Sequence, residues 1–405
     1  MTMRDAFSLH HGNRTGHVLA RALILAPLAL AGAVGCGDPS TPGGSSSSAG
    51  ASSGGTSSGT GGKAGTSSGG ATSTGGASTG GASSGGASSG GASSGGASSG
   101  GACAAPSAAV TTPNRTVKNW NGHKGAVSFT IDDAYGSALD VVVPALKQRN
   151  IVGTFYVICN NVASRVADWK AAAMAGNEVT NHTMSHAPAS NGNLAELTDC
   201  DAYIKTNLGV TSNSFAYPLS NVADPYKSYT TANYIGGRGG STAPPALVRM
   251  TDNPDWSNIS ADYTGGGEYG TLAKDAINSG IDASVSQDAW YVITTHSILP
   301  ENNFAGIPAA DYEAELDHAI ASGAWIGTFA QVAAYARAQK TLTAAVMGGG
   351  TTWTWTAAAG TPDGTTLRVV IDGGSLTQGG TALQWNCDGG YYPVDVKTGE
   401  LTWSP

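Results

Sequence analysis

The alternation of two sequence patterns between residues 106 and 340 constrains the fold more than any other feature of this chain. Runs with strand character, most of them apolar, lie at 126–131, 153–158, 177–182, 214–218, 289–296 and 324–329. Amphipathic runs with helical spacing lie at 138–150, 165–176, 194–209, 311–323 and 330–340. Repeated strand–helix units predict a mostly parallel sheet covered by helices, and a segment of this length favours a closed or nearly closed α/β barrel.

The pattern changes after this segment, and residues 341–405 predict a small C-terminal all-β module. Trp353 and Trp355 share one face at the period of a strand. Such a pair can stack on sugar rings. A core role is favoured, because so small a domain needs its aromatic side chains inside.

The N-terminal part of the chain predicts export. Residues 1–36 combine a basic leader with an apolar run, 22–34, that is shorter than the ~20 residues of a membrane-spanning helix. The run ends in "AVGC", which resembles a bacterial lipoprotein signal with Cys36 as the lipidated residue. An ordinary signal peptide cleaved nearby is the alternative.

Residues 37–105 predict a flexible linker. They are dominated by Gly, Ser, Ala and Thr, with "GGASS" repeated, and so have little apolar surface to offset the entropy of ordering. We therefore expect a lipid-anchored protein exposed at the cell envelope, on the outer membrane or the cell surface. A secreted or periplasmic protein is the alternative. The formal net charge of −8 argues against a nucleic-acid partner, and we expect a monomer whose only membrane contact is its lipid.

Five cysteines fit an exported protein with disulfides. If Cys36 carries lipid, four cysteines remain, which allow three pairings. Cys159 follows a strand and Cys200 lies in a helix soon after it, so this pair is favoured. It would leave Cys103 to pair with Cys387.

Residues that suit chemistry follow three of the predicted strands. Asp132 and Asp133 end the first strand, where carboxylates are rarely buried unless they are paired or bind a metal. Taken alone, a polar turn that caps the next helix explains them better. His182 and His186 lie four residues apart, without the Glu of an HExxH motif, and His296 ends the strand 289–296.

Together these residues predict a hydrolytic site, because the carboxyl ends of parallel strands meet at one edge of the sheet. One carboxylate and two imidazoles can hold a metal ion and leave a position open for water. The second carboxylate can take a proton from that water, and His296 can give one to a leaving group. This set suits hydrolysis of an amide or an ester.

"TIDD", "HTMSH" and "TTH", in this order and at these intervals, resemble the polysaccharide deacetylases, the fourth family of carbohydrate esterases, with its NodB-homology domain. The resemblance covers about 115–340 and extends to "GTFYVI" and "GAWIGTFAQVAAYAR". It implies a distorted (β/α) barrel and one divalent ion, often zinc, with cobalt, nickel or manganese as alternatives. It also implies hydrolysis of N-acetyl groups on amino sugars or of O-acetyl groups on xylan.

The resemblance implies a role for each of the five residues. By position, Asp133, His182 and His186 would bind the metal. Asp132 would be the general base and His296 the general acid.

A third motif of the family resembles "FAYPLS", with Tyr217 and Pro218. The N–H of Leu219 would be the oxyanion donor. Ala216 stands where the family commonly has an arginine that orients the base, so that role must be filled otherwise or left open. Arg238, in "GGRGG", is at best a positional match to a family motif.

A fourth motif has a formal match in "DNPDW", in which Asp252 would tune His296 and Trp256 would form a wall of the pocket. The sequence thus predicts a metal-dependent deacetylase of a polymer with N-acetylglucosamine, such as peptidoglycan, poly-N-acetylglucosamine or a chitin-like chain. An acetyl xylan esterase and an inactive glycan-binding surface protein are the alternatives. Retention of all five core residues argues against the inactive protein, and Ala216 argues for it.

Overall fold

The computed structural model describes residues 104–108, 110–191, 193–240, 244–265, 271–303, 305–347 and 349–405. The predicted signal segment 1–36, with Cys36, and nearly all of the predicted linker lie outside these residues. Within the described ranges, no helix is both long and apolar enough to cross a membrane.

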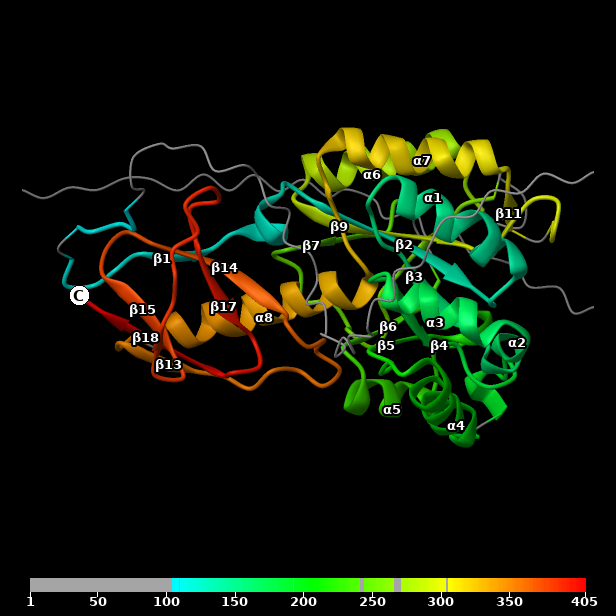
Figure 1. Cartoon of the computed structure of the whole chain (residues 1–405), viewed down its shortest axis with the longest axis horizontal. Coiled ribbons are helices and arrows are strands. Elements are labelled where there is room, and N and C mark those ends of the chain that lie inside the picture. Colours follow the sequence, from blue (N-terminus) through cyan, green and yellow to red (C-terminus); the bar gives the residue numbers. More distant parts are fainter. Residues whose placement is uncertain are drawn as a thin grey trace, which may run out of the picture. The chain divides into compact units, whose positions relative to one another are not determined.

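A curled sheet of parallel strands forms the centre of the larger domain (Figure 1). Its strands, in spatial order, are β6 (Gly236–Arg238), β5 (Ser214–Ala216), β4 (Glu178–Asn181), β3 (Thr154–Val157), β2 (Ala126–Asp132) and β9 (Ala289–Thr295). β12 (Trp325–Ile326) pairs with the start of β2. β7 (Leu247–Arg249) runs antiparallel to the first half of β9.

The sheet closes through the segment between β7 and β9. The N–H of Ile259 donates to Gly237 O at 2.7 Å, and the N–H of Gly239 donates to Ile259 O at 2.8 Å. The same segment continues into β8 (Asp262–Tyr263), which pairs in parallel with β9. The predicted distorted (β/α) barrel is therefore confirmed, with one irregular segment, between β7 and β9, in place of a regular strand.

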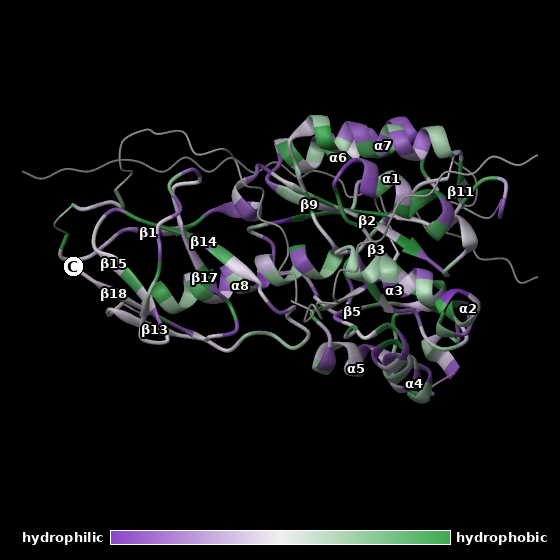
Figure 2. Ribbon diagram, in the orientation of Figure 1, coloured by the Kyte–Doolittle hydropathy of each residue, from purple (hydrophilic) through white to green (hydrophobic). Residues whose placement is uncertain are grey.

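Helices cover the outer face of the barrel. They are α1 (Val143–Gln148), α2 (Cys159–Val162), α3 (Val166–Met174), α4 (Ala195–Tyr203), α5 (Tyr226–Asn233), α6 (Lys274–Ser286) and α7 (Ala309–Ser322). The first turns of α8 (Phe329–Met347) instead pack against inward-facing side chains near the amino ends of the strands, such as Trp290 and Val292. Hydrophilic and hydrophobic residues alternate along α6 and α7, as expected for helices with one buried face (Figure 2). Neither α5 nor α6 was predicted, because both are poor in large apolar residues.

The two faces of each strand have different neighbours, since successive side chains point to opposite sides. Phe129 and Ile131 of β2 point outward and join the core under the helices. Ser128, Thr130 and Asp132 point into the barrel, where the Thr130 hydroxyl lies 2.8 Å from that of Thr294. The barrel interior therefore becomes polar toward the carboxyl ends of the strands.

The C-terminal residues form a small β module of two antiparallel sheets, as predicted. One sheet contains β1 (Arg115–Val117), β14 (Thr366–Ile371) and β17 (Tyr392–Asp395). The other contains β13 (Thr352–Thr354), β18 (Glu400–Ser404), β15 (Ser375–Gln378) and β16 (Thr381–Ala382). Trp353 is 2% exposed and belongs to the core between them, which confirms the core role favoured for it.

The boundary predicted at residue 341 is not a clean division. β1 precedes the barrel in the sequence yet pairs with β14, and the last turns of α8 place Leu342 in the core of the module. The module is therefore built from both ends of the described chain.

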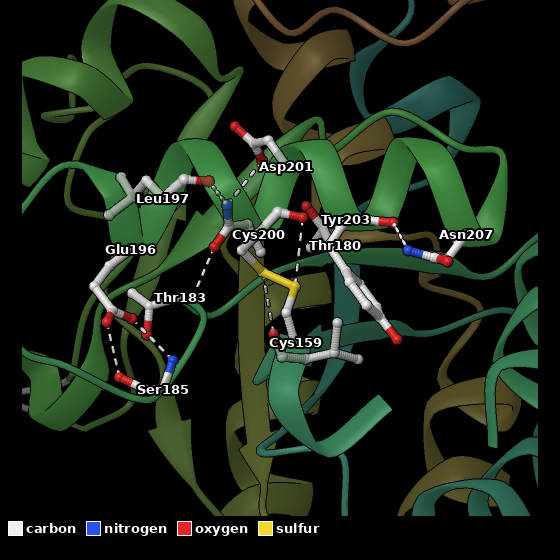
Figure 3. Close-up of a disulfide and its surroundings, with 12 residues drawn as sticks. Cys159, Thr180, Thr183, Ser185, Glu196, Leu197, Cys200, Asp201, Tyr203 and Asn207 are labelled. Atoms are coloured by element: carbon white, nitrogen blue, oxygen red, sulfur yellow. Dashed lines mark hydrogen bonds between the residues drawn. A yellow bond between two sulfur atoms is a disulfide. The ribbon is translucent and has the colours of Figure 1, made fainter. Parts of the chain in front are cut away.

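The predicted disulfide between Cys159 and Cys200 is present (Figure 3). Cys387 is also disulfide-bonded. Its predicted partner, Cys103, lies outside the described residues.

Candidate metal and catalytic site

A cavity of about 590 Å³ opens at the carboxyl ends of the barrel strands. It contains most of the residues that the sequence singled out and several that it did not. Its lining includes Asp132, Asp133, Tyr135, Asn161, His182, His186, Tyr217, Leu219, Ser220, Tyr263, His296 and Asn302.

Three side chains in this pocket form a cluster suited to a metal ion. Asp133 Oδ1 lies 3.5 Å from His182 Nε2 and 3.6 Å from His186 Nε2, and the three ligand atoms lie within 4.8 Å of one another. Asp133 Oδ1 is buried and has no hydrogen-bond partner. A buried carboxylate oxygen without a donor, facing two imidazole nitrogens, fits zinc or a neighbouring divalent ion.

The surroundings of the cluster support this fit. His182 Nδ1 lies 2.9 Å from Ala216 O, so that this nitrogen carries the proton and Nε2 keeps its lone pair toward the cluster. Burial lowers the pKa of His186, and the neighbouring His182 lowers it further. Burial alone would raise the pKa of Asp133, but its interactions with the nearby histidines lower it. Anionic carboxylate and neutral imidazole are the forms that bind a metal.

The loop that carries His186 is held by two helices (Figure 3). At the start of α2, the N–H of Cys159 donates to Thr183 O at 3.0 Å. From α4, the carboxylate of Glu196 accepts the N–H and the hydroxyl of Ser185, both at 2.8 Å. The disulfide joins these same two helices, so it braces both sides of the ligand loop.

The backbone is strained at the same place. Asp133, Thr183 and His186 have φ values of 72°, 70° and 65°, and Leu219 and Ser220 across the pocket have 56° and 53°. Non-glycine residues adopt this left-handed region at a cost, and such residues gather at functional sites.

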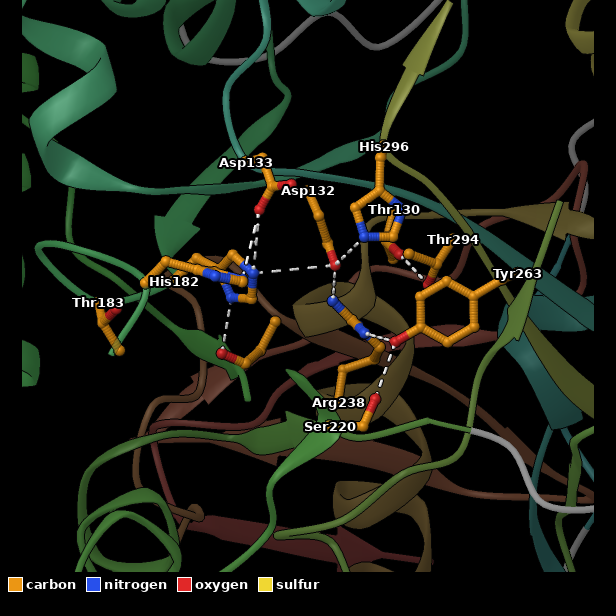
Figure 4. A network of polar contacts seen from close by, with 12 residues as sticks. Thr130, Asp132, Asp133, His182, Thr183, Ser220, Arg238, Tyr263, Thr294 and His296 are labelled. Atoms are coloured by element: carbon orange, nitrogen blue, oxygen red, sulfur yellow. Dashed lines mark hydrogen bonds and ion pairs between the residues drawn. The ribbon is translucent and has the colours of Figure 1, made fainter. Parts of the chain in front are cut away.

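Asp132 lies beside the cluster and is held by one oxygen (Figure 4). Its Oδ2 accepts a hydrogen bond from Arg238 Nη2 in an ion pair whose two side chains are at most 3% exposed. Its Oδ1 is buried without a hydrogen-bond partner. Burial acts to lower the pKa of Arg238, but the charge of Asp132 outweighs it and raises the pKa, so the guanidinium stays charged. Asp132 is therefore fixed in orientation and keeps one oxygen free to accept a proton.

Arg238 resolves the question raised by Ala216. In the parallel pair of β5 and β6, Ala216 lies directly opposite Arg238. The two side chains project from the same face of the sheet. The cation that orients Asp132 therefore comes from β6, whereas the family resemblance places it at position 216 on the neighbouring strand β5. The sequence held a signal for it, a lone arginine in a glycine-rich strand, but only the strand pairing shows its partner.

His296 follows β9 and completes the site. Its Nε2 lies 4.0 Å from Asp132 Oδ2, and its side chain is 11% exposed. Burial lowers its pKa, which the charge of Asp132 counteracts. The ring of Tyr263, which sequence reasoning missed, stacks on the imidazole with centroids 5.6 Å apart and an angle of 17°.

Two residues predicted for the pocket lie elsewhere. The carboxylate of Asp252 accepts the N–H of Arg249 at 2.7 Å in a turn outside the pocket. The ring of Trp256 lies 5.6 Å from the Arg337 guanidinium and packs against the core. Neither can serve as predicted, because the segment after β7 turns away before β8 enters the barrel. Tyr217 and Leu219 do line the pocket, with Pro218 between them.

A barrel with an Asp-His-His cluster, flanked by a carboxylate oxygen without a hydrogen-bond partner and by an imidazole, suits metal-assisted hydrolysis of an amide or an ester. Residues 120–234 match the family profile described as polysaccharide deacetylase. The part of the chain that carries Asp132, Asp133, His182 and His186 is therefore similar to this family.

A curated relative is chitin deacetylase 1 of Cryptococcus neoformans, 27% identical over 161 residues, which is 37% of this chain. The match spans 33% of that relative. Among solved structures, a putative polysaccharide deacetylase from Mycobacterium smegmatis covers 56% of this chain and 94% of its own, with 17% identity and a TM-score of 0.42. The peptidoglycan deacetylase PdaC from Bacillus subtilis covers 56% and 98%, with 16% identity and a TM-score of 0.40.

Proposed function

We propose that this protein is a divalent-metal-dependent deacetylase of a polysaccharide that contains N-acetylglucosamine. One observation carries the proposal. The Asp133, His182 and His186 cluster shares a single pocket with Asp132 Oδ1, which has no hydrogen-bond partner, and with His296.

Each residue has a role that follows from its surroundings. Asp133, His182 and His186 would hold the ion, which when bound supplies a Lewis acid that activates water and polarises a carbonyl. Asp132, locked by Arg238 through Oδ2, takes the proton of the attacking water on Oδ1. The N–H of Leu219 donates to the oxygen that gains charge. His296 gives a proton to the departing group.

The choice of an N-acetyl substrate depends on His296. An amine is a poor leaving group unless it is protonated, whereas an alkoxide leaves an ester with less help. A buried imidazole beside Asp132 therefore suits amide hydrolysis better than ester hydrolysis.

The structure bears differently on the two alternative functions. An acetyl xylan esterase would use the same five residues. An inactive glycan-binding protein loses its main support, because Arg238 supplies the cation that Ala216 does not.

We also propose that the mature protein is lipidated on Cys36 and works at the cell envelope, most readily on peptidoglycan or an exported poly-N-acetylglucosamine. This extension depends on residues outside the described ranges. A Cys36→Ser variant should move from the membrane to the soluble fraction.

Acetate release on matched substrates tests the proposal. We expect acetate and new free amines from N-acetylglucosamine oligomers, loss of both with a chelator, and recovery with zinc, cobalt, nickel or manganese. Activity on acetylated xylan alone would favour the esterase. Binding of glycans without acetate release, in a protein that has bound metal, would favour the inactive protein.

A further inference from the structure

We infer that Tyr263 is a positioning residue that holds the acid, the base and the oxyanion turn in one arrangement. The inference rests on the proposed function and extends it to a residue outside the sequence motifs. Tyr263 acts through two separate parts, its ring and its hydroxyl, and each part has its own contacts (Figure 4).

The ring contacts the general acid. Tyr263 on β8 pairs with Thr294 on β9, two residues before His296, so both side chains lie at the same end of the barrel. The stacked geometry, with 5.6 Å between centroids and 17° between planes, restricts rotation of the imidazole. Without the ring, His296 would gain freedom to turn its Nε2 away from the reacting atoms.

The hydroxyl contacts the base and the turn. Arg238 Nη1 donates to the Tyr263 hydroxyl at 2.8 Å, so the phenolic oxygen is the acceptor there. Its own hydrogen is then available for Ser220 Oγ, 3.1 Å away. Arg238 in turn holds Asp132, and Ser220 follows Leu219 in the strained turn that presents the oxyanion donor.

Removing the ring of Tyr263 and removing its hydroxyl should reduce the reaction rate in different ways. The acid matters most when the leaving group is poor, so loss of the ring should slow amides more than activated esters. The base and the oxyanion turn serve both substrates, so loss of the hydroxyl should slow both to the same degree. A merely structural tyrosine would not divide its effects in this way.

The experiment compares Tyr263→Leu, Tyr263→Phe and the reference His296→Ala on N-acetylglucosamine oligomers and on an aryl acetate with a good leaving group. For Tyr263→Leu we expect kcat on the amide to fall roughly 10²-fold and kcat on the ester to fall much less, in the same sense as His296→Ala. For Tyr263→Phe we expect a fall of about 5- to 10-fold on both substrates, with metal occupancy unchanged. Tyr229→Phe, which removes a hydroxyl bonded to Asp201 away from the pocket, is the matched control.

Equal losses on both substrates for Tyr263→Leu would overturn the role of the ring. Wild-type rates in Tyr263→Phe would overturn the role of the hydroxyl. Crystal structures of both variants give a readout that does not depend on activity. His296 should adopt a new orientation in Tyr263→Leu and keep its own in Tyr263→Phe. If the wild type releases no acetate, the proposed function fails while this structural test still decides the positioning role.

Discussion

At the scale of single residues, the adjacent Asp132 and Asp133 have different proposed roles because different side chains surround them. Asp133 faces two imidazoles, whereas Asp132 faces a guanidinium. We expect Asp133→Ala to lose bound metal and activity together, because it removes a ligand. Metal analysis of the purified protein beside acetate release checks this, with the exposed Asp168→Asn as the control. Full activity in the Ala variant would refute the ligand assignment.

The neighbouring variant, Asp132→Asn, should keep the metal and lose turnover by roughly 10²–10⁴-fold, since an amide cannot take the proton. It should also melt at a lower temperature, because buried Arg238 loses its counter-charge. Loss of metal in this variant would mean that the two aspartates exchange roles.

A third residue makes stability depend on pH. Glu315 on α7 is fully buried. Its Oε1 accepts a hydrogen bond from the Thr264 hydroxyl at 2.7 Å, and its Oε2 has no hydrogen-bond partner. Burial raises its pKa from 4.5 to about 8, so the folded protein holds this proton more tightly than the unfolded chain. The stabilising effect is complete below about pH 4.5 and is lost as the pH rises toward about 8, on the order of a few kcal/mol.

Melting temperatures from pH 5 to pH 8 test this. The wild type should lose stability across the range, and Glu315→Gln should lose less, while the exposed Glu400→Gln should follow the wild type. Some dependence should remain in Glu315→Gln, because burial also raises the pKa of Glu178. Equal slopes in Glu315→Gln and the wild type would show that Glu315 is not the source.

At the scale of strands and helices, the pairing of β5 with β6 predicts that an arginine at position 216 can replace Arg238 as the partner of Asp132. Arg238→Ala should cost most of the activity and roughly 3–5 kcal/mol of stability, because Asp132 is left buried without its cation. Adding Ala216→Arg places a guanidinium on the opposite position of the neighbouring strand. We expect the double variant to recover part of both losses, with the exposed Arg249→Ala as a neutral control. No recovery in kcat or melting temperature would contradict the equivalence of the two positions.

The same pairing shows what sequence patterns can and cannot predict. Asp132, His182 and His296 were predictable, since Asp132 and His296 end strands with visible apolar runs, His182 lies four residues before His186, and parallel strands meet at one edge. Arg238 and Tyr263 were not, because their strands are only three and two residues long and their partners lie far away in the sequence. Asp252 matches the family motif in "DNPDW" by its sequence alone, but the irregular segment between β7 and β8 places it outside the pocket.

At the scale of the whole molecule, the chain forms its C-terminal module from two distant segments. This arrangement was not predicted, because a three-residue strand before the barrel carries almost no periodic signal. β1 pairs with β14 along its length, and Asn114 donates to both carboxylate oxygens of Asp372 at 2.8 Å. The residues before the barrel therefore stabilise the far end of the chain.

Two truncations separate this role from that of the linker. Both truncated chains lack Cys103, the predicted partner of Cys387, so they and the full-length reference all carry Cys387→Ser. In this background, a chain of residues 105–405 keeps β1 and should match the full-length protein in melting temperature and in acetate release. A chain of residues 119–405 lacks β1, so β14 becomes an exposed edge, and the core around Trp353 loses Val117, which packs against it. We expect the shorter chain to melt earlier and to aggregate. Differential scanning calorimetry and light scattering measure both effects. If both truncated chains melt at the same temperature, β1 adds nothing to the module. If only the shorter chain is impaired, the segment that leads out of the linker is a structural part of the C-terminal module.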